Sequence, residues 1–267
     1  MKLSYSTLAC PEWTLDDVIE RSKGYGFDGV ELRCMGDKHI NTDMTAAQRR
    51  DIRARFAEKG LAIASVAGYS SFCTDDVSEL RKNADLAKAT IDLAADLGAP
   101  YVRTFMGEYP EHLTLDQMAK IAAGPIDECG KHAGERGVML LIETHDAFTT
   151  GEKLAKVFAH ITSPHIGVLW DFAHSIRDGE PLEAAWGYFG DKIRHTHVKD
   201  FKPVDGKERY CFVGQGEVPV AEVARFLMGK GYRGYLSLEW EKTWHPELEP
   251  PEAAFPAYVE YMRSLRA

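Results

Sequence analysis

The sequence predicts a single (β/α)₈ barrel over residues 1–267. Short β-rich runs alternate with amphipathic segments along the whole chain, and several of these segments end in a glycine that suits a left-handed helix C-cap, as in KGYGFDGVEL and EKGLAIAS. No linker or low-complexity segment interrupts the alternation, which favours one barrel. A doubly wound sheet is the alternative, but its first strand is usually followed by a glycine-rich nucleotide loop, and LACPEWT follows here.

The elements can be placed in order from this pattern. The expected strands cover residues 3–9, 27–33, 61–68, 101–106, 138–145, 166–172, 193–199 and 234–240. The expected helices between them include residues 14–24, 45–59, 78–97, 114–136, 151–161 and 220–229. Eight repeats of strand then helix match the length of a typical barrel.

Composition excludes several functional classes. The chain is 45% hydrophobic and 27% charged, without a secretion signal or an apolar run that could span a bilayer, so we expect a cytoplasmic protein with no membrane partner. Five scattered cysteines, none in a CxxC pair, suit a reducing compartment. The formal net charge of −9 argues against a nucleic-acid partner, which would require a basic face. Assembly as a homo-oligomer is left open.

Four consecutive strands in the second half of the chain end in potential metal ligands. LLIETH supplies Glu143, GVLWDFAH supplies Asp171, IRHTHVKD supplies His197 and YLSLEWE supplies Glu239. Barrel active sites form at the carboxyl ends of the strands. Three carboxylates at that end would repel one another unless a cation lay among them. The sequence therefore predicts one divalent ion, with Mn²⁺ or Mg²⁺ favoured and Co²⁺ or Zn²⁺ as alternatives.

At these residues the sequence resembles the xylose isomerase-like barrel superfamily, and more narrowly the sugar phosphate isomerase/epimerase group. The resemblance extends from GFDGVELR near the start to GYRGYLSLEWE near the end. It implies that Glu143, Asp171, His197 and Glu239 are the metal ligands, and that Glu143 and Glu239 also form an acid/base pair. It further implies that His174, in WDFAH, binds a substrate oxygen.

The ETH segment is instead similar to that of 3-dehydroshikimate dehydratases, in which the corresponding histidine, here His145, transfers a proton. Strand alternation independently places His145 on the same face as Glu143, one step further out, so a chemical role is favoured over a loop hydrogen bond. His195 lies one step deeper than His197, so we expect it to pack near the ligands rather than bind the ion.

Other polar residues have two readings each. Lys199, one step above His197, either reaches a substrate oxygen or is solvated, and for Glu241 a surface role is favoured. Glu31 and Arg103 either line the cavity or form interior salt bridges. The loop RYCFVGQGEVP contains Gly214 and Gly216 at a place where barrels often bind phosphate, but a tight turn explains it equally well. Core or loop packing is favoured over a role as cavity wall for the aromatic residues Trp13, Tyr69 and Trp244.

The predicted function is isomerisation or epimerisation of a small keto- or aldo-sugar or a related polyol. The ion would hold a carbonyl and an adjacent hydroxyl and stabilise an enediolate, while Glu143 and a second group, Glu239 or His145, move the proton. A dehydratase or lyase acting on a 3-keto polyol or 3-keto glycoside, with His145 as acid, is the main alternative. An endonuclease IV-like enzyme would need a multi-metal cluster and a basic face, and a silent binding subunit fits poorly with a complete set of four ligands.

Overall fold

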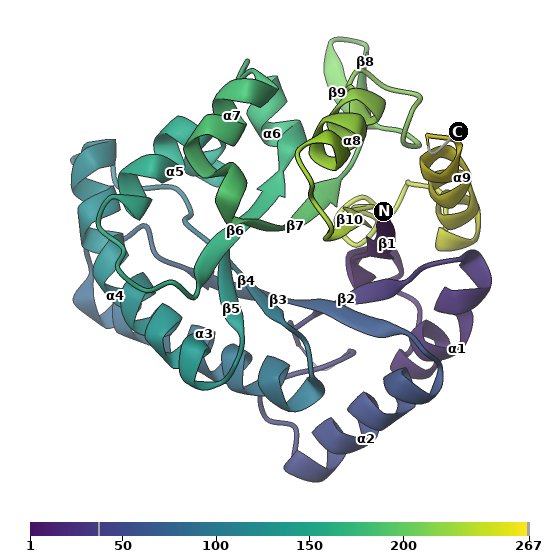
Figure 1. Ribbon diagram of the computed structural model, residues 1–267, viewed down its shortest axis with the longest axis horizontal. Helices are drawn as coiled ribbons and strands as arrows, with labels where there is room; N and C mark the ends of the chain where they lie inside the picture. The colour runs from purple at the N-terminus through teal and green to yellow at the C-terminus, as the bar shows by residue number, and fades with distance from the viewer. Residues whose placement is uncertain (37, 266–267) are drawn as a thin grey trace.

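Eight parallel strands form a nearly closed barrel in the computed structural model, which describes residues 1–36 and 38–265 (Figure 1). Their order in the sheet is β1-β10-β7-β6-β5-β4-β3-β2, and a bridge between Ser6 and Glu31 brings the two ends together. The predicted barrel is therefore confirmed. The strands are β1 (Lys2–Tyr5), β2 (Gly29–Arg33), β3 (Ala62–Ser71), β4 (Tyr101–Phe105), β5 (Met139–Glu143), β6 (Ile166–Asp171), β7 (Ile193–Val198) and β10 (Tyr235–Leu238).

Helices surround the strands on the outside of the barrel (Figure 1). Thr14, Thr45 and Thr114 each form a capping box at the start of a helix. The threonine side chain accepts from the backbone N–H three residues later, and the side chain of that residue accepts from the backbone N–H of the threonine. Gly26 and Gly98 end helices at positive φ, as the glycine pattern predicted. The helices are α1 (Leu15–Tyr25), α2 (Ala46–Glu58), α3 (Val77–Leu97), α4 (Leu115–Glu135), α5 (Gly151–Phe158), α6 (Phe172–Arg177), α7 (Leu182–Phe189), α8 (Val220–Gly229) and α9 (Pro251–Ser264).

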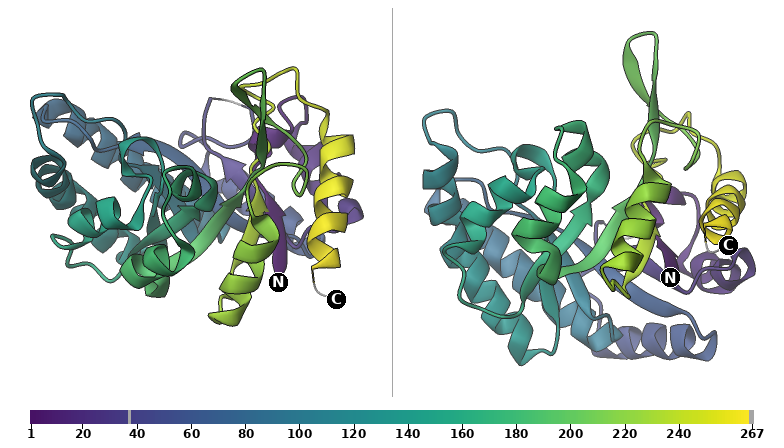
Figure 2. Two further views of the ribbon diagram at one scale, coloured as in Figure 1. Left: turned by 90° about the horizontal axis from the view of Figure 1, so that it is seen from above. Right: turned by 45° about the horizontal axis from the view of Figure 1, so that its top comes forward.

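Three local features differ from the expected elements. The first strand stops at Tyr5, because a short 3₁₀ helix, Thr7–Ala9, follows it. The connection after β6 contains two helices, α6 and α7, separated by a turn with Gly179 at positive φ. A hairpin of β8 (Phe201–Val204) and β9 (Lys207–Tyr210) follows β7 and projects away from the barrel (Figure 2). Its Asp-Gly turn, at residues 205–206, has positive φ at both positions and was a recognisable hairpin signal in the sequence.

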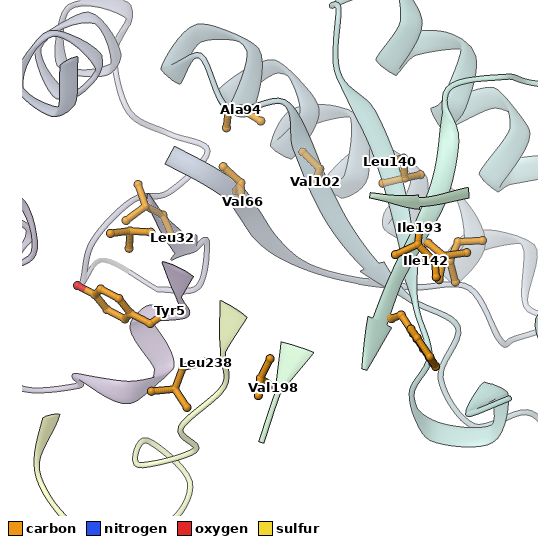
Figure 3. Packing of buried hydrophobic residues seen from close by; sticks show 14 of the residues in the cluster. Tyr5, Leu32, Val66, Ala94, Val102, Leu140, Ile142, Ile193, Val198 and Leu238 are labelled. Atoms are coloured by element: carbon orange, nitrogen blue, oxygen red, sulfur yellow. The ribbon is translucent and has the colours of Figure 1, made fainter. Parts of the chain in front are cut away.

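Strand alternation divides the side chains of the barrel into two groups. Outward-facing residues such as Leu32, Val66, Val102, Leu140 and Val198 are fully buried and pack with residues from the surrounding helices (Figure 3). Burial of each such side chain stabilises the fold by about 1.5–3 kcal/mol. The residues between them along the strands face the interior, and many are polar: Ser4, Glu31, Ser65, Arg103, Glu143, Asp171, His195, His197 and Ser237. The apolar core therefore lies outside the sheet, and the polar groups lie within the barrel.

The loop after the β8–β9 hairpin is held by one buried carboxylate. Asp200 Oδ2 accepts hydrogen bonds from the backbone N–H groups of Gly214 and Gly216, both at 2.9 Å, and Oδ1 accepts from Phe201 and Val218 at 2.9 and 3.0 Å. A Cβ atom at Gly216 would overlap Asp200 Oδ1, which explains the glycine. The tight-turn reading of this loop is therefore correct, because Asp200 occupies the N–H groups that a phosphate would need.

No helix in the described part of the chain combines the length and the apolar character needed to cross a membrane.

We predict that Asp200→Ala lowers the free energy of unfolding by roughly 3 kcal/mol, since it leaves buried backbone N–H groups without an acceptor. Asp200→Asn should lose less, because its amide oxygen can still accept from part of the loop. Urea unfolding monitored by circular dichroism would measure both. An Asp200→Ala variant as stable as the parent protein would show that the loop does not depend on this carboxylate.

Candidate metal centre

The four predicted ligands converge at the carboxyl ends of neighbouring strands. Glu143 is the last residue of β5, Asp171 the last of β6, His197 the fifth of the six residues of β7, and Glu239 follows β10. All four are buried, and one potential ligand atom from each lies within 4.8 Å of those of the others. We refer to Glu143, Asp171, His197 and Glu239 as the quartet.

Sheet register explains this convergence. Strands β5, β6, β7 and β10 are consecutive in the barrel, so their ends are adjacent. His197 pairs with Asp171 of β6 on one side and with Ser237 of β10 on the other. Glu239 is two residues beyond Ser237, so it faces the same interior one step further out. Local strand pairing therefore brings the quartet to one level of the barrel.

The donor set of the quartet suits a divalent cation. It offers three carboxylates and one imidazole, and Asp171 Oδ2 is buried without a hydrogen bond from any described residue. Lys199 Nζ lies 2.7 Å from that oxygen, an ionic contact outside hydrogen-bonding geometry. Two permanent cations, Lys199 and Arg103, face the three carboxylates of the quartet and two further glutamates, Glu31 and Glu241. The buried cluster could therefore bind a metal ion, whose charge would reduce the remaining repulsion.

His197 lies at the centre of the cluster. Its Nδ1 is 2.7 Å from Glu143 Oε1 and 3.2 Å from Glu239 Oε1, while its Nε2 is 3.0 Å from Glu31 Oε1. Burial alone would lower the pKa of this imidazole, but Glu239, Glu31 and Glu143 together raise it well above its ordinary value. Because only the neutral ring can bind a metal, ion binding here would be coupled to loss of a proton.

Glu31 joins a second imidazole to the cluster from the opposite side of the barrel. Its Oε2 lies 3.2 Å from Nε2 of His195, which is one step deeper than His197, as the sequence predicted. Burial would raise the pKa of Glu31, but the two histidines lower it well below its usual value. One potential ligand atom from each of Glu31, His195 and His197 also lies within 4.8 Å of the others, but this group contains only one carboxylate. Its geometry suits orientation of His197 rather than a separate ion.

Arg103 forms an interior salt bridge with the quartet. Its Nη1 donates to Glu143 Oε2 at 3.2 Å, and its Nε and Nη2 donate to the backbone oxygen of Gly68 at 3.1 and 3.0 Å. Burial would raise the pKa of Glu143, but His197 and Arg103 lower it below its ordinary value. Glu143 is therefore held as a carboxylate and in a fixed position.

Lys199 is buried, so the solvated reading of this residue is wrong. Its Nζ lies 2.7 Å from Asp171 Oδ2, 2.9 Å from Glu239 Oε2 and 3.2 Å from Glu241 Oε1. Glu241 also accepts from the Tyr210 hydroxyl at 2.8 Å, so it has buried partners in addition to its position near the surface. Burial raises the pKa of Asp171 to about 6, although Lys199 opposes this rise.

His145 and His174 lie together above the quartet, with ring centroids 4.7 Å apart. Burial, Lys199 and His145 lower the pKa of His174 to about 2, so its ring is neutral. Its Nδ1 lies 2.7 Å from Arg177 Nη2, and its Nε2 lies 3.1 Å from Lys199 Nζ and 3.4 Å from Asp171 Oδ2. His174 therefore points directly at a quartet ligand.

His145 forms a carboxylate–imidazole pair with its neighbour. Its Nδ1 is 2.8 Å from Asp146 Oδ1, and one third of its side chain is exposed. Burial would lower the pKa of His145, but Asp146 and Glu143 raise it. Within the described residues no hydrogen bond involves its Nε2, so this atom can exchange a proton with a ligand.

Of the three aromatic candidates, one lies in the apolar core and two lie near the mouth of the barrel. Trp13 is buried against Tyr25 and Phe255, so packing is its role. Trp244 is 51% exposed, and Tyr69 lies between two arginines near the barrel mouth.

A cavity of about 770 Å³ opens at the other end of the barrel. Its lining includes the first residues of several strands, among them Lys2, Ala62, Tyr101, Ile193 and Tyr235. Since barrel chemistry takes place at the carboxyl ends, we do not assign the active site to this cavity.

Several known proteins are similar to this chain. It is 28% identical over 240 residues to a 3-dehydroshikimate dehydratase of Pseudomonas putida, covering 85% of this chain but only 36% of that protein. It is 22% identical over 252 residues to a fructoselysine 3-epimerase of Shigella flexneri, covering 90% of both chains. The crystal structure of the IOLI protein with a bound zinc atom superposes on this chain with a TM-score of 0.83 and 18% sequence identity. The match covers 99% of this chain and 98% of the IOLI chain.

These curated relatives are enzymes, epimerases and dehydratases alike. The chain spans about a third of the dehydratase and almost all of the epimerase. The family model for xylose isomerase-like TIM barrels matches residues 19–265, which include the whole quartet. The chain therefore belongs to the family of xylose isomerase-like TIM barrels.

Proposed function

We propose that this protein is a metal-dependent isomerase or epimerase of a small sugar, keto-sugar or polyol. The quartet would bind one divalent ion, with Mn²⁺ or Mg²⁺ favoured by its oxygen-rich donors and Zn²⁺ or Co²⁺ as alternatives. The observation that carries the proposal is the position of Glu143 and Glu239. Both carboxylates contact Nδ1 of the same histidine, His197, but Glu143 ends β5 and Glu239 follows β10, and two strands lie between β5 and β10.

This arrangement suits proton transfer at two faces of a bound substrate. A bound divalent ion would stabilise negative charge on a substrate oxygen. Glu143, held by Arg103, would remove a proton from the carbon beside the carbonyl, and Glu239 would return one from the other side. Glu239 must carry a proton before it can return one; burial favours that protonated form, whereas His197 and Lys199 oppose it by lowering the pKa of Glu239. His174, whose Nε2 lies 3.4 Å from Asp171 Oδ2, would orient a substrate oxygen beside the quartet.

A dehydratase or lyase acting on a 3-keto polyol or 3-keto glycoside is the second candidate. The His145–Asp146 pair favours it, because an imidazole oriented by a carboxylate is suited to protonate a leaving hydroxyl. The similarity to 3-dehydroshikimate dehydratase, over 85% of this chain, also supports this alternative. The two candidates share the metal and the base but differ in the role of His145.

Substitution of His145 and Glu239 tests which reaction takes place. In an isomerase, Glu239→Gln should abolish turnover, while His145→Ala should mainly raise KM, since only binding is lost. In a dehydratase, His145→Ala should lower kcat by roughly 10²–10⁴, the usual contribution of a proton-transfer group. The assay incubates keto-sugars and keto-polyols with the metal-loaded protein in D₂O and follows deuterium incorporation and water loss by mass spectrometry. An eliminated product together with a large kcat defect in His145→Ala would decide for the lyase.

Metal binding makes a separate prediction about stability. An ion that binds only the folded quartet stabilises it, by about 2.7 kcal/mol at a free concentration one hundred times Kd. Chelation should therefore lower Tm, and Asp171→Ala should remove most of the bound metal. Asp75→Ala, at an exposed carboxylate outside the quartet, is the control. Elemental analysis showing equal metal in Asp171→Ala and in the control would rule out the quartet as the binding site.

Glu31 should act as a positioning residue for His197. Its carboxylate holds Nε2, which leaves Nδ1 directed at the quartet. We expect Glu31→Gln to weaken metal binding roughly 10- to 100-fold, as loss of an outer carboxylate usually does. Ser65→Ala is the matched control, since Ser65 pairs with Glu31 in the sheet and its buried hydroxyl has no hydrogen bond from a described residue. Competition with a fluorescent chelator would measure both variants, and equal affinities would disprove the positioning role.

A further inference from the structure

Arg33 is held in one orientation at the carboxyl end of β2. Its Nε donates to the Tyr69 hydroxyl at 2.7 Å, and its Nη1 donates to Thr243 Oγ1 at 3.0 Å. Thr243 is itself fixed, because its backbone N–H and its hydroxyl both donate to the backbone oxygen of Leu8, at 3.2 and 2.8 Å. The loops after β1, β2 and β10 therefore meet at this guanidinium.

Exposed side chains lie beside Arg33. Its Cζ is 5.2 Å from the ring centroid of Trp244, which is 51% exposed, and its Nη2 is 3.4 Å from the sulfur of Met35, which is 48% exposed. Single exposed apolar side chains are common, but here two of them lie against one guanidinium. We call Arg33, Met35, Tyr69, Thr243 and Trp244 the rim patch.

The rim patch is connected to the quartet by contacts. The Tyr69 ring lies between two guanidinium groups, with its centroid 5.7 Å from Arg33 Cζ and 4.7 Å from Arg103 Cζ. Arg103 in turn donates to Glu143 of the quartet at 3.2 Å. The rim patch therefore lies at the same end of the barrel as the quartet, with Tyr69 and Arg103 between Arg33 and Glu143.

Arg33 differs from the two buried cations of the metal centre in its partners. Arg103 and Lys199 each contact carboxylates, whereas Arg33 has no carboxylate partner in the described part of the chain. A guanidinium has five N–H groups, and the contacts of Arg33 use three of them, one with a thioether sulfur, a weak acceptor. The other N–H groups remain available to an oxyanion, the partner that a guanidinium binds best.

We propose that the rim patch binds an oxyanionic group, a carboxylate or a phosphate, on the end of the substrate remote from the reacting carbons. This inference rests on the proposed function and names its substrate class. The carboxylates at the barrel mouth repel an anionic substrate, so a fixed cation at the rim is required to admit one. Trp244, 5.2 Å from the guanidinium carbon, would cover one side of the bound oxyanion. A neutral sugar would make no use of this charge.

Matched pairs of compounds test the proposal with the metal-loaded protein in D₂O. L-ribulose 5-phosphate and L-ribulose form the phosphate arm, while 3-dehydroshikimate and its methyl ester form the carboxylate arm. We expect the anionic member of one arm to react with a kcat/KM at least about tenfold higher than its neutral partner. Arg33→Ala should remove this preference through KM, Arg33→Lys should keep part of it, and both should leave the neutral compounds within about twofold.

Arg50→Ala, at an exposed arginine of α2 without an ion pair to a described residue, is the control and should behave like the parent protein. Equal kcat/KM within both pairs, or equal loss for charged and neutral members in Arg33→Ala, would overturn the rim patch assignment. Reaction of neutral ketoses alone would do the same while supporting the proposed function. The two hypotheses therefore fail separately.

A binding measurement removes the dependence on turnover. Ribitol 5-phosphate lacks a carbonyl and cannot react, so its addition should change tryptophan fluorescence only through binding. We expect a saturable change in the parent protein, no change in Trp244→Phe, and at least tenfold weaker binding in Arg33→Ala. Ribitol, the neutral control, should give no change in any variant. The same response in the parent and Arg33→Ala proteins would contradict the proposal.

Discussion

Burial of negative charge at the mouth of the barrel is the constraint on which this structure depends. Glu31, Glu143, Asp171 and Glu239 are all nearly inaccessible to water, and an unpaired buried carboxylate is strongly unfavourable. The chain meets this constraint with Arg103, Lys199 and the imidazole of His197, each in contact with at least one of these carboxylates. These cations and imidazoles do not balance the whole charge, and the remaining excess is the physical reason why the cluster could bind a metal ion.

The division between stability and chemistry follows from the period of a β-strand. In β5, Leu140 and Ile142 face the helices and belong to the apolar core, whereas Glu143 faces the interior. In β7, Val198 belongs to the core, whereas His195 and His197 face the interior. Each strand thus contributes one face to folding and the other to the site. Different side chains therefore form the apolar core outside the sheet and the polar interior, so packing of the core fixes the strands that carry the site.

The candidate site contains more groups able to transfer a proton than the proposed reaction would need. Glu143 and Glu239 flank His197, and the His145–Asp146 pair lies above them beside His174. An isomerase and a dehydratase share the first proton abstraction and differ in where the second proton goes. The relatives of this chain include both kinds of enzyme, and under the proposed function the position of the substrate relative to His145 would decide between them. A charge fixed at Arg33 would act on that choice by setting how the substrate lies.

The sequence alone determined the barrel and the quartet, because both depend on local periodicity. Alternating strands and helices, glycine C-caps and one carboxylate or histidine at the end of each of four consecutive strands were sufficient to place Glu143, Asp171, His197 and Glu239 together. The Asp-Gly turn of the β8–β9 hairpin is an equally local signal, but the expected strands did not include this hairpin.

Only the tertiary structure decided the contacts between elements that are distant along the chain. Glu31 of β2 reaches His197 of β7 across the interior, because closure of the barrel brings non-adjacent strands face to face. Lys199 is buried because three carboxylates from β6 and from the segment after β10 surround it, and Asp200 holds a glycine loop more than ten residues away. Strand parity fixes which face a side chain occupies, but the partner it meets depends on the curvature of the closed sheet and the course of the loops, which no local pattern encodes.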